Sequence, residues 1–390
     1  MKKKICFLTD SIFSFGGVQR VTAVIARLLA AEHDVTIVTF DRPEAKDTTL
    51  YNLSDAPTIS YRFFSYPAVK PLKHLLCKCY SAVYRKMHLP WRWASKLYGH
   101  SSFPSEMRGV LLSELHQGHY DTIVGVHAPI AARLATLKSH LDTTRCIGWI
   151  HNSFEALYGP TSLYIGPELK RHYVFQLQRL DETVVLCHHD AQCYTNYDAR
   201  FTPTVVYNPL TLQAGQPSAG TSKRFLAVGR FSHRHKGFDL LIDAFHRFAQ
   251  DNREWTLHLV GEGPEEPLYR KMIAQYHLEE RVVIHPFTRH IQDYYSQAQV
   301  YVLSSRWEGF GLVLVEAMAH GLPVVSSNLP TSEEIMGDFG LYFDNGNVEQ
   351  LAQRLHDATC IDWQQKSAQA ATIVERFSPE RIAQQWKKIL

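Results

Sequence analysis

The chain has few cysteines, and they follow no pattern that would build a disulfide framework or a zinc site. Seven cysteines are scattered through 390 residues. The nearest pair, Cys77 and Cys79, has one residue between its members, which is not a usual spacing for zinc ligands. We therefore expect reduced thiols and a cytoplasmic location.

The chain also lacks a long hydrophobic run. No stretch of it approaches the ~20 apolar residues that a membrane-spanning helix needs. The first four residues are mostly basic, but the apolar run at residues 5–8 is too short for a signal peptide, and Asp10 interrupts it. We expect a protein that is soluble or bound peripherally to a membrane.

Positive and negative charges almost balance, and the usual metal-binding patterns are missing. The formal net charge is only +3, so composition makes no case for a nucleic-acid partner. No Asp-x-Asp pair follows a predicted strand, and the 21 histidines do not fall at ligand spacing with carboxylates. We expect no metal site. The 45% hydrophobic and 20% charged residues are typical of a globular enzyme.

The length and the hydrophobic pattern indicate two α/β domains, because 390 residues exceed the size of one growing core. Short apolar segments alternate with amphipathic segments in both halves, which predicts parallel sheets covered by helices. A segment rich in Gly, Pro, Ser and Gln indicates the linker between the two domains. The predicted divisions are a first domain at 1–208, a linker at 209–222, a second domain at 223–376 and a final helix at 377–390.

The most informative segment begins at Glu308 and runs through Gly309, Phe310 and Gly311 into a helix that carries Glu316. Glycines let the backbone approach a ligand closely. The start of the helix presents unpaired N–H groups that favour an anion such as a phosphate. Two carboxylates beside an anion site can bind the hydroxyl groups of a polyol. The segment therefore predicts a nucleotide-sugar site, although two solvated glutamates in an ordinary α/β unit would give the same pattern.

A second segment points to the same ligand. A predicted strand at 225–228 is followed by Gly229 and Arg230, and then by Lys236 and Gly237 before the helix at 238–248. Arg and Lys between a strand and a helix can hold a diphosphate, Arg through its planar fork and Lys as a point charge. Either cation alone would more often be an ordinary surface residue.

Together these residues resemble the donor half of the family-4 glycosyltransferases, which have the GT-B fold of two Rossmann-like domains facing each other across a cleft. The resemblance is specific over most of residues 205–390 and weaker before them. It implies that Arg230 and Lys236 hold the donor diphosphate, that Glu308 contacts the donor sugar and that Glu316 contacts the ribose. It also implies that the final helix crosses back onto the first domain.

The resemblance extends to further residues of the donor site. The loop Gly16–Gly17 after the first strand matches the family's glycine-rich loop, although most such pairs are merely turns. Backbone groups near Gly261 and Phe287 are expected to hold the base. The full predicted donor-binding set is Gly16, Gly17, Arg230, Lys236, Gly261, Phe287, Glu308, Gly309, Phe310, Gly311, Leu312 and Glu316.

Two histidines end predicted strands in the first domain and are candidates for the acceptor side. His127 follows the strand at 122–126, and His151 follows the strand at 146–150 and precedes Asn152. The family pattern places a histidine that contacts the donor sugar after the first of these strands, which favours His127 as a catalytic residue with Arg230 and Lys236. Glu308 completes the predicted catalytic set. His127, His151 and Asn152 form the predicted acceptor side.

Residues 66–103 form a basic and aromatic insertion. They contain seven Lys or Arg and no Asp or Glu, with apolar residues at helical spacing and the pair Trp91 and Trp93. Cationic amphipathic helices with aromatic residues tend to lie on anionic membranes. The same cations could bind the diphosphate of a polyprenyl-linked acceptor. The alternative is a helical insertion packed on the domain with its basic side in water.

These expectations combine into a retaining, metal-independent glycosyltransferase. It would transfer a hexose-type sugar from a nucleotide sugar, most simply a UDP-sugar, to a glycan or lipid-linked acceptor in cell-surface polysaccharide or glycolipid assembly. It would need no cofactor and would work at the inner face of the cytoplasmic membrane. The alternatives are a GT-B sugar-nucleotide epimerase and a non-catalytic nucleotide-sugar-binding subunit. The basic insertion argues against the epimerase, and the intact pair Glu308 and Glu316 argues against the silent subunit.

Overall fold

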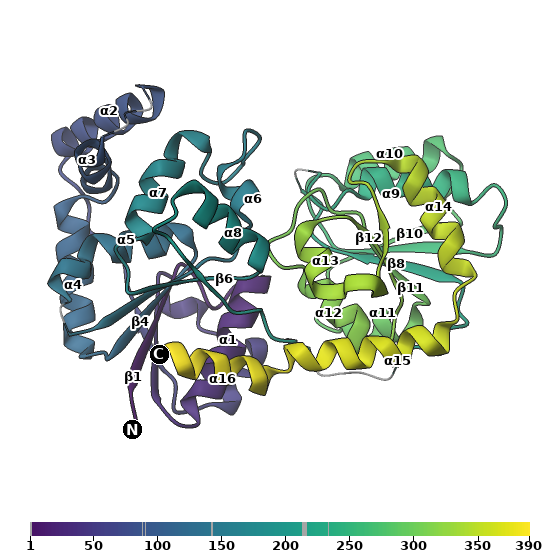
Figure 1. Cartoon of the computed structure of the whole chain (residues 1–390), viewed down its shortest axis with the longest axis horizontal. Coiled ribbons are helices and arrows are strands. Elements are labelled where there is room, and N and C mark those ends of the chain that lie inside the picture. The colour runs from purple at the N-terminus through teal and green to yellow at the C-terminus, as the bar shows by residue number, and fades with distance from the viewer. Residues whose placement is uncertain (1, 88, 90, 142, 213–216, 233) are drawn as a thin grey trace. The chain divides into compact units, whose positions relative to one another are not determined.

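The structure is a computed structural model, and it describes residues 2–87, 89, 91–141, 143–212, 217–232 and 234–390. The chain divides into two compact units. Unit 1 comprises Met1–Pro209 together with Pro379–Leu390, and unit 2 comprises Leu210–Ser378. Each unit is an α/β unit built around one parallel sheet (Figure 1).

Unit 1 alternates strands and helices in the order β1 Lys4–Thr9, α1 Gly17–Ala30, β2 Asp34–Thr39, β3 Ser60–Phe63, α2 Pro71–Met87, α3 Arg92–Ser102, α4 Ser105–Gly118, β4 Thr122–Val126, α5 Ala128–Leu137, β5 Arg145–Trp149, α6 Phe154–Tyr158, α7 Lys170–Leu177, β6 Glu182–Val185, α8 His188–Tyr197, β7 Thr204–Val205 and, at the end of the chain, α16 Pro379–Ile389. Its seven strands pair in the order β3-β2-β1-β4-β5-β6-β7. All neighbouring strands are parallel.

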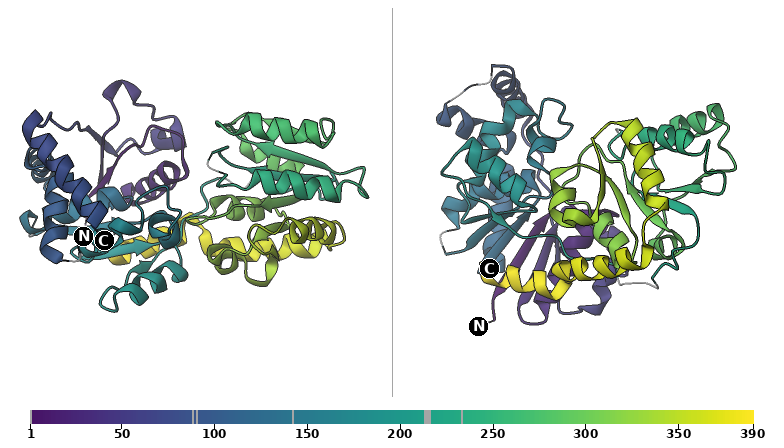
Figure 2. Two further views of the ribbon diagram at one scale, coloured as in Figure 1. Left: turned by 90° about the horizontal axis from the view of Figure 1, so that it is seen from above. Right: turned by 45° about the vertical axis from the view of Figure 1, so that its right-hand side comes forward.

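Unit 2 has the order β8 Arg224–Val228, α9 Phe238–Phe248, β9 Thr256–Val260, α10 Glu266–Gln275, β10 Val282–His285, α11 Ile291–Gln297, β11 Val300–Leu303, α12 Leu312–Ala319, β12 Val324–Ser327, α13 Pro330–Met336, β13 Leu341–Phe343, α14 Val348–Thr359 and α15 Trp363–Val374. The six strands are parallel and pair in the order β10-β9-β8-β11-β12-β13. The left view of Figure 2 shows this sheet between two layers of helices.

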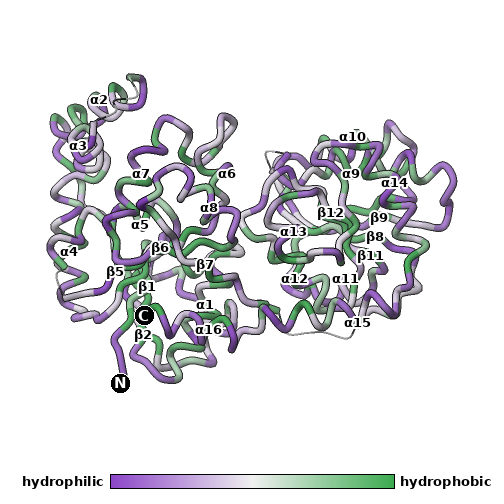
Figure 3. The backbone as a smooth tube through the Cα atoms, viewed as in Figure 1, coloured by the Kyte–Doolittle hydropathy of each residue, from purple (hydrophilic) through white to green (hydrophobic). Residues whose placement is uncertain are grey.

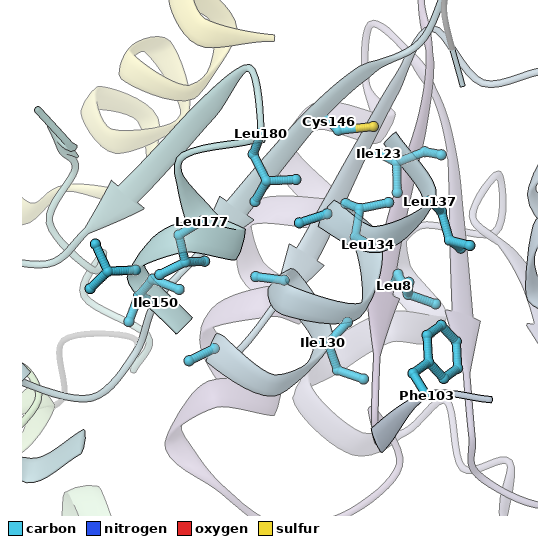
Figure 4. Packing of buried hydrophobic residues seen from close by; sticks show 14 of the residues in the cluster. Leu8, Phe103, Ile123, Ile130, Leu134, Leu137, Cys146, Ile150, Leu177 and Leu180 are labelled. Carbon is cyan, nitrogen blue, oxygen red and sulfur yellow. The ribbon is translucent and has the colours of Figure 1, made fainter. Parts of the chain in front are cut away.

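The core of each unit forms where the apolar faces of the helices meet the strands. In unit 1, Leu8, Ile123 and Cys146 of three adjacent strands pack with Ile130 and Leu134 of α5 (Figure 4). In the hydropathy colouring of Figure 3, most of the hydrophobic chain lies in such interior segments. Because strands buried on both faces must be apolar throughout, the continuous apolar runs of the sequence become these strands.

The final helix α16 packs on unit 1. Trp386 is fully buried, and its ring centroid lies 4.6 Å from that of Trp149 at the end of β5. Arg145 Nε donates to the carbonyl oxygen of Ile389 over 2.7 Å. Residues 375–377 form a short 3-10 helix in unit 2, and α16 begins after it at Pro379.

The predicted linker at 209–222 is mostly part of unit 2. Residues 213–216 lie outside the described part of the chain. Among the others, Ser218 Oγ donates to the carbonyl oxygen of Ala298, and the ring of Trp363 lies against Gly220. The described residues after Pro209 thus pack on the second sheet's helices instead of spanning freely between the units.

Candidate active site

Both sheets have a topological switch point at a place where predicted site residues gather. In unit 1 the strand order reverses between β1 and β4, and in unit 2 between β8 and β11. The chain leaves these neighbouring strands in opposite directions, and ligands of open α/β sheets bind in the resulting crevice at the carboxyl ends. In unit 2, Arg230 follows β8 and Glu308 follows β11.

The loop that carries Lys236 is fixed to the loop after β11. Ser304 Oγ donates to the carbonyl oxygen of Lys236 over 2.8 Å, and the N–H of Arg306 donates to the carbonyl oxygen of His235 over 2.8 Å. Gly237 has φ 62°, and a Cβ there would collide with the carbonyl oxygen of Ser304. Glycine is therefore required for this close approach. His233, in the same basic loop, lies outside the described residues.

Lys236 and Glu308 form a buried ion pair. Lys236 Nζ lies 2.6 Å from Glu308 Oε1, and their side chains are 13% and 8% exposed. Ser305 Oγ donates to the same carboxylate oxygen over 2.6 Å. Burial is the largest single influence and opposes ionisation of Glu308, but the charges of Lys236 and His235 and the hydrogen bonds from Lys236 and Ser305 together lower the pKa of the carboxyl. Gly229 gives the stem of Lys236 its room, because a Cβ at Gly229 would meet it within 2.7 Å.

Arg230 provides a positive charge that can meet a ligand. Its side chain is exposed, and it makes no ion pair with any residue in the part of the chain that the structure describes. Its loop is held in place because Gly229 N–H donates to the carbonyl oxygen of Val260 over 3.0 Å. A Cβ at Gly261 would collide with the carbonyl oxygen of Gly229, so the loops after β8 and β9 touch through glycine.

The N-terminus of α12 completes the candidate phosphate site. Gly311 is its N-cap residue with φ 84° and provides no side-chain cap. Within the described residues, the N–H groups of Leu312 and Val313 donate to no backbone or side-chain acceptor. Phe310 is buried, and its ring centroid lies 5.7 Å from that of Phe377. This packing anchors the Gly309–Gly311 turn, so that the helix start can meet an anion.

Glu316, which is predicted to contact the ribose, is buried and already hydrogen-bonded within the protein. It is only 2% exposed, and its Oε2 accepts a hydrogen bond from the Tyr295 hydroxyl over 3.0 Å. Thr211 Oγ1 donates to Oε1 over a longer 3.4 Å. Phe287 follows β10, and its side chain is 44% exposed. Tyr295 and Thr211 were missed by sequence reasoning, because no local pattern connects them to Glu316.

In unit 1, His127 is held in a rare backbone conformation. It follows β4 as the N-cap residue of α5 with φ 76°, which is uncommon outside glycine. Its N–H donates to the carbonyl oxygen of Trp149 over 2.9 Å, which keeps it in place. Strain of this kind concentrates at functional sites, so the conformation supports a ligand-facing role.

The structure brings His127, His151 and Asn152 together. The two imidazole centroids are 5.4 Å apart, and Asn152 hydrogen-bonds to the His127 side chain. Burial lowers the pKa of His127 and lowers the pKa of His151 well below its ordinary value, so both rings are neutral at pH 7. Nε2 of His151 is buried without a hydrogen-bond partner among the described residues. Such a group is a candidate for a substrate contact.

The glycine-rich loop of unit 1 is organised by two residues that sequence reasoning missed. The N–H of Gly16 donates to the Tyr51 hydroxyl over 2.9 Å, and Gly17 begins α1. The carboxylate of Asp41 accepts from the N–H groups of Ile12 and Phe13 over 2.7 and 3.1 Å. Asp41 comes just after the second strand, and that position was the available signal.

Among the described residues, one group could hold a metal ion: Glu155, His189 and Cys193 in unit 1, whose ligand atoms lie within 4.8 Å of one another. No helix in the described part of the chain is long and apolar enough to cross a membrane. The charged residues and helix N–H groups of unit 2 can act by electrostatic attraction. Arg230, Lys236 and the start of α12 can bind a diphosphate, and the two carboxylates can accept hydrogen bonds from hydroxyl groups.

Comparisons with known proteins agree with this geometry. Residues 222–359 match the family model described as Glycosyl transferases group 1. The amylovoran biosynthesis glycosyltransferase AmsD of Erwinia amylovora is 26% identical over 99% of this chain and 99% of its own. Residues 222–359 are thus similar to the glycosyl transferases group 1 domain, which supports a glycosyltransferase.

Solved structures confirm the predicted fold. The apo form of the lipopolysaccharide outer core galactosyltransferase WaaB has a TM-score of 0.69 at 18% identity and covers 99% of this chain and 98% of its own. Alr3699/HepE of Anabaena, in complex with UDP and glucose, has a TM-score of 0.73 at 21% identity with the same coverage. The fold is α/β of the GT-B class, as predicted.

Proposed function

We propose that this protein is a retaining glycosyltransferase of family 4 that transfers a hexose-type sugar from a UDP-sugar to a glycan or lipid-linked glycan. The acceptor would be an intermediate of cell-surface polysaccharide or glycolipid assembly. The observation that carries the proposal is the joint position of Arg230, the Lys236–Glu308 pair and the start of α12 at the switch point of unit 2. The names of the similar proteins support the donor and the acceptor class.

The proposed chemistry uses charge stabilisation of the leaving group. As the bond from the sugar to the diphosphate breaks, negative charge develops on the diphosphate oxygens. Arg230, Lys236 and the N–H groups of α12 would stabilise that charge, which is usually the largest catalytic contribution in such a site. Because these groups are present in unit 2 itself, the transfer would need no metal to stabilise the leaving group.

Glu308 fits a sugar-binding role better than that of a nucleophile. Its Oε1 already accepts from both Lys236 and Ser305, so its charge is held by two donors. A carboxylate held in this way can orient sugar hydroxyl groups. Retention would then follow from attack on the face from which the diphosphate leaves. The neutral imidazoles of His127 and His151 would hydrogen-bond to sugar or acceptor hydroxyl groups.

Glu316 would reach the ribose by exchanging one partner. The short hydrogen bond from Tyr295 positions the carboxylate, whereas the bond from Thr211 is long and weak. A ribose hydroxyl would replace Thr211 at Oε1. The base would lie near Gly261 and Phe287.

A lipid-linked acceptor implies work at a membrane surface, and α2 has a face suited to it. Leu72, Leu75, Leu76, Val83 and Met87 recur at helical spacing and are 46–72% exposed, and we call this set the α2 apolar ridge. Trp91 and Trp93 are exposed nearby and stack with centroids 5.7 Å apart. Sequence periodicity predicted the helix but not that this side would be uncovered. Figure 1 shows α2, α3 and α4 following one another along one side of unit 1.

The basic charge of this insertion is smaller than the sequence suggested. Lys73 lies 2.7 Å from Glu106 and Arg85 lies 3.0 Å from Glu168, so two of the seven cations are neutralised by unit 1. Lys78 and Lys86 are exposed and make no ion pair with a described residue. We propose that the α2 apolar ridge inserts into an anionic inner leaflet while such lysines meet its headgroups.

Vesicle sedimentation tests the membrane contact. We expect binding to anionic vesicles that weakens with salt, and no binding to zwitterionic vesicles. A double change Leu75→Ser and Leu76→Ser should abolish binding, and Arg85→Gln should change it little because Arg85 is already paired. Equal binding of the ridge variant and the wild type would contradict the proposal.

The proposed activity is tested by a thermal-shift screen of nucleoside diphosphates followed by turnover of radiolabelled UDP-sugars. A ligand that binds only the folded state raises its apparent stability. We expect UDP to stabilise the protein and label to appear in a glycan or glycolipid acceptor. Consumption of UDP-sugar without an acceptor would indicate an epimerase, and binding without consumption would indicate a silent subunit.

A further inference from the structure

Three potential metal ligands from two helices of unit 1 come together near the carboxyl edge of its sheet. Glu155 lies in the first turn of α6, and His189 and Cys193 lie one turn apart on α8. α6 and α8 follow the neighbouring strands β5 and β6. The sequence spacing gave no sign of this group, because 34 residues separate Glu155 from His189.

The three ligand atoms are already close to the separation that one ion would impose. His189 Nε2 lies 3.0 Å from Glu155 Oε1. Cys193 Sγ lies 3.3 Å from the same oxygen and 3.4 Å from His189 Nε2. Tetrahedral zinc, with its usual bond lengths, would place such atoms roughly 3.3–3.6 Å apart. The group therefore needs only a small expansion to hold an ion.

The scaffold below the cluster fixes α6 against α8. The buried carboxylate of Asp190 accepts from the N–H of Phe154 over 2.8 Å and from the thiol of Cys187 over 3.3 Å. The rings of Phe154 and Tyr194 pack with centroids 4.9 Å apart. Both helices are thus held before any ion arrives, and such preorganisation favours metal affinity.

From this geometry we infer that Glu155, His189 and Cys193 form a site for a divalent transition metal of the zinc type. Thiolate and imidazole donors select zinc-like ions over Mg²⁺ and Ca²⁺, which prefer oxygen ligands. The three side chains leave a fourth tetrahedral position for water or another donor. Binding deprotonates Cys193, whose proton passes to the buffer while the Sγ–metal bond forms.

The metal would act as a clamp between α6 and α8. Glu155 follows His151 and Asn152 by a few residues, so the clamp would restrain the loop that presents the predicted acceptor-side groups. This role is separate from the diphosphate chemistry of unit 2. The metal would stiffen the loop that follows β5 and would take no part in leaving-group stabilisation.

The test uses the metal-stripped full-length protein with Co²⁺ and Zn²⁺ as probes. We expect one equivalent of Co²⁺ to give a thiolate-to-cobalt charge-transfer band, and Zn²⁺ to displace it. Cys193→Ser should remove the band and weaken competitive Zn²⁺ binding by at least about tenfold. Cys360→Ser, which changes an exposed cysteine of unit 2, should leave both unchanged.

A second variant and a second measurement keep the result interpretable. Glu155→Gln removes a ligand charge but no sulfur, and it should weaken Zn²⁺ binding while the cobalt band persists at higher Co²⁺ concentration. UDP affinity measured in parallel reports on the donor site alone. Absence of the cobalt band in the wild type, or equal Zn²⁺ affinity in Cys193→Ser, would show a hydrogen-bonded cluster only and overturn the inference.

Discussion

Replacing Lys236 by methionine is the change whose consequences the structure defines best. Methionine keeps most of the length of the Lys236 side chain that passes Gly229. The substitution therefore changes the free energy of unfolding little through lost packing. The substitution removes the ammonium that lies 2.6 Å from Glu308. Glu308, only 8% exposed, then keeps the hydrogen bond from Ser305 and loses its opposite charge.

The cost should be large at neutral pH and smaller in acid. Removing one partner of a buried ion pair costs about 3–5 kcal/mol, and the remaining Ser305 bond favours the lower end, about 3 kcal/mol. Against burial, which is the largest single influence, Lys236 together with His235 and Ser305 holds the pKa of Glu308 below its ordinary value. In the variant, burial acts without Lys236 and raises this pKa. The wild type therefore loses stability as the pH falls through its lowered pKa, whereas the variant regains stability as Glu308 takes up a proton.

Hydrogen exchange of peptides covering β11 and α12 measures this cost within unit 2, so that separate unfolding of unit 1 does not interfere. We expect the free energy of opening to fall by about 3 kcal/mol at pH 7.5 and by clearly less at pH 5.0. Lys271→Met, which changes an exposed lysine of α10, is the matched control and should have little effect. A deficit that is equal at both pH values, or below about 1 kcal/mol, would refute the buried pair as described.

Three further predictions concern the same unit. Gly237→Ala should destabilise the protein in chemical denaturation by more than Gly346→Ala, which shares a positive φ but has nothing within 4 Å of a new Cβ. Equal effects would mean that the close approach to the backbone carbonyl is unimportant. Tyr295→Phe leaves the buried Glu316 carboxylate one donor short, which should cost roughly 1.5–3 kcal/mol of stability and weaken UDP binding in calorimetry; unchanged values for both would remove this bond from the site. Transfer of sugar by the Zn²⁺-loaded enzyme should continue without Mg²⁺ or Mn²⁺, and full loss on their removal, reversed by either ion, would contradict diphosphate binding by Arg230 and Lys236 alone.

The sheets could be predicted from the sequence because their strands are buried on both faces. Continuous apolar runs such as residues 122–126 and 300–303 are found in β4 and β11. The edge of the first sheet is different, because β7 is only Thr204–Val205. A short strand at the edge of a sheet has little hydrophobic pattern of its own, so its end is set by pairing with β6.

The site residues could be proposed as separate ligand contacts, but their mutual contacts could not. Lys236 and Glu308 are 72 residues apart, and each pattern was interpreted only through an external ligand. Their ion pair depends on how the loops after β8 and β11 meet. The burial of Glu316 beneath Tyr295 depends likewise on α11 packing, which no local motif encodes. The α2 apolar ridge shows the same limit, because helical spacing cannot tell which side of a helix will be covered.

Calorimetric titration of UDP into the Arg230→Met variant tests the central claim most directly. Arg230 is exposed and unpaired among the described residues, so its removal should leave folding unchanged. A lost charged hydrogen bond is worth roughly 1.5–3 kcal/mol, which is about a 10- to 150-fold weaker affinity for UDP. The control Arg253→Met, an exposed arginine in the turn before β9, should bind UDP as the wild type does. Equal affinity in all three proteins would contradict a nucleotide diphosphate site at the switch point of unit 2.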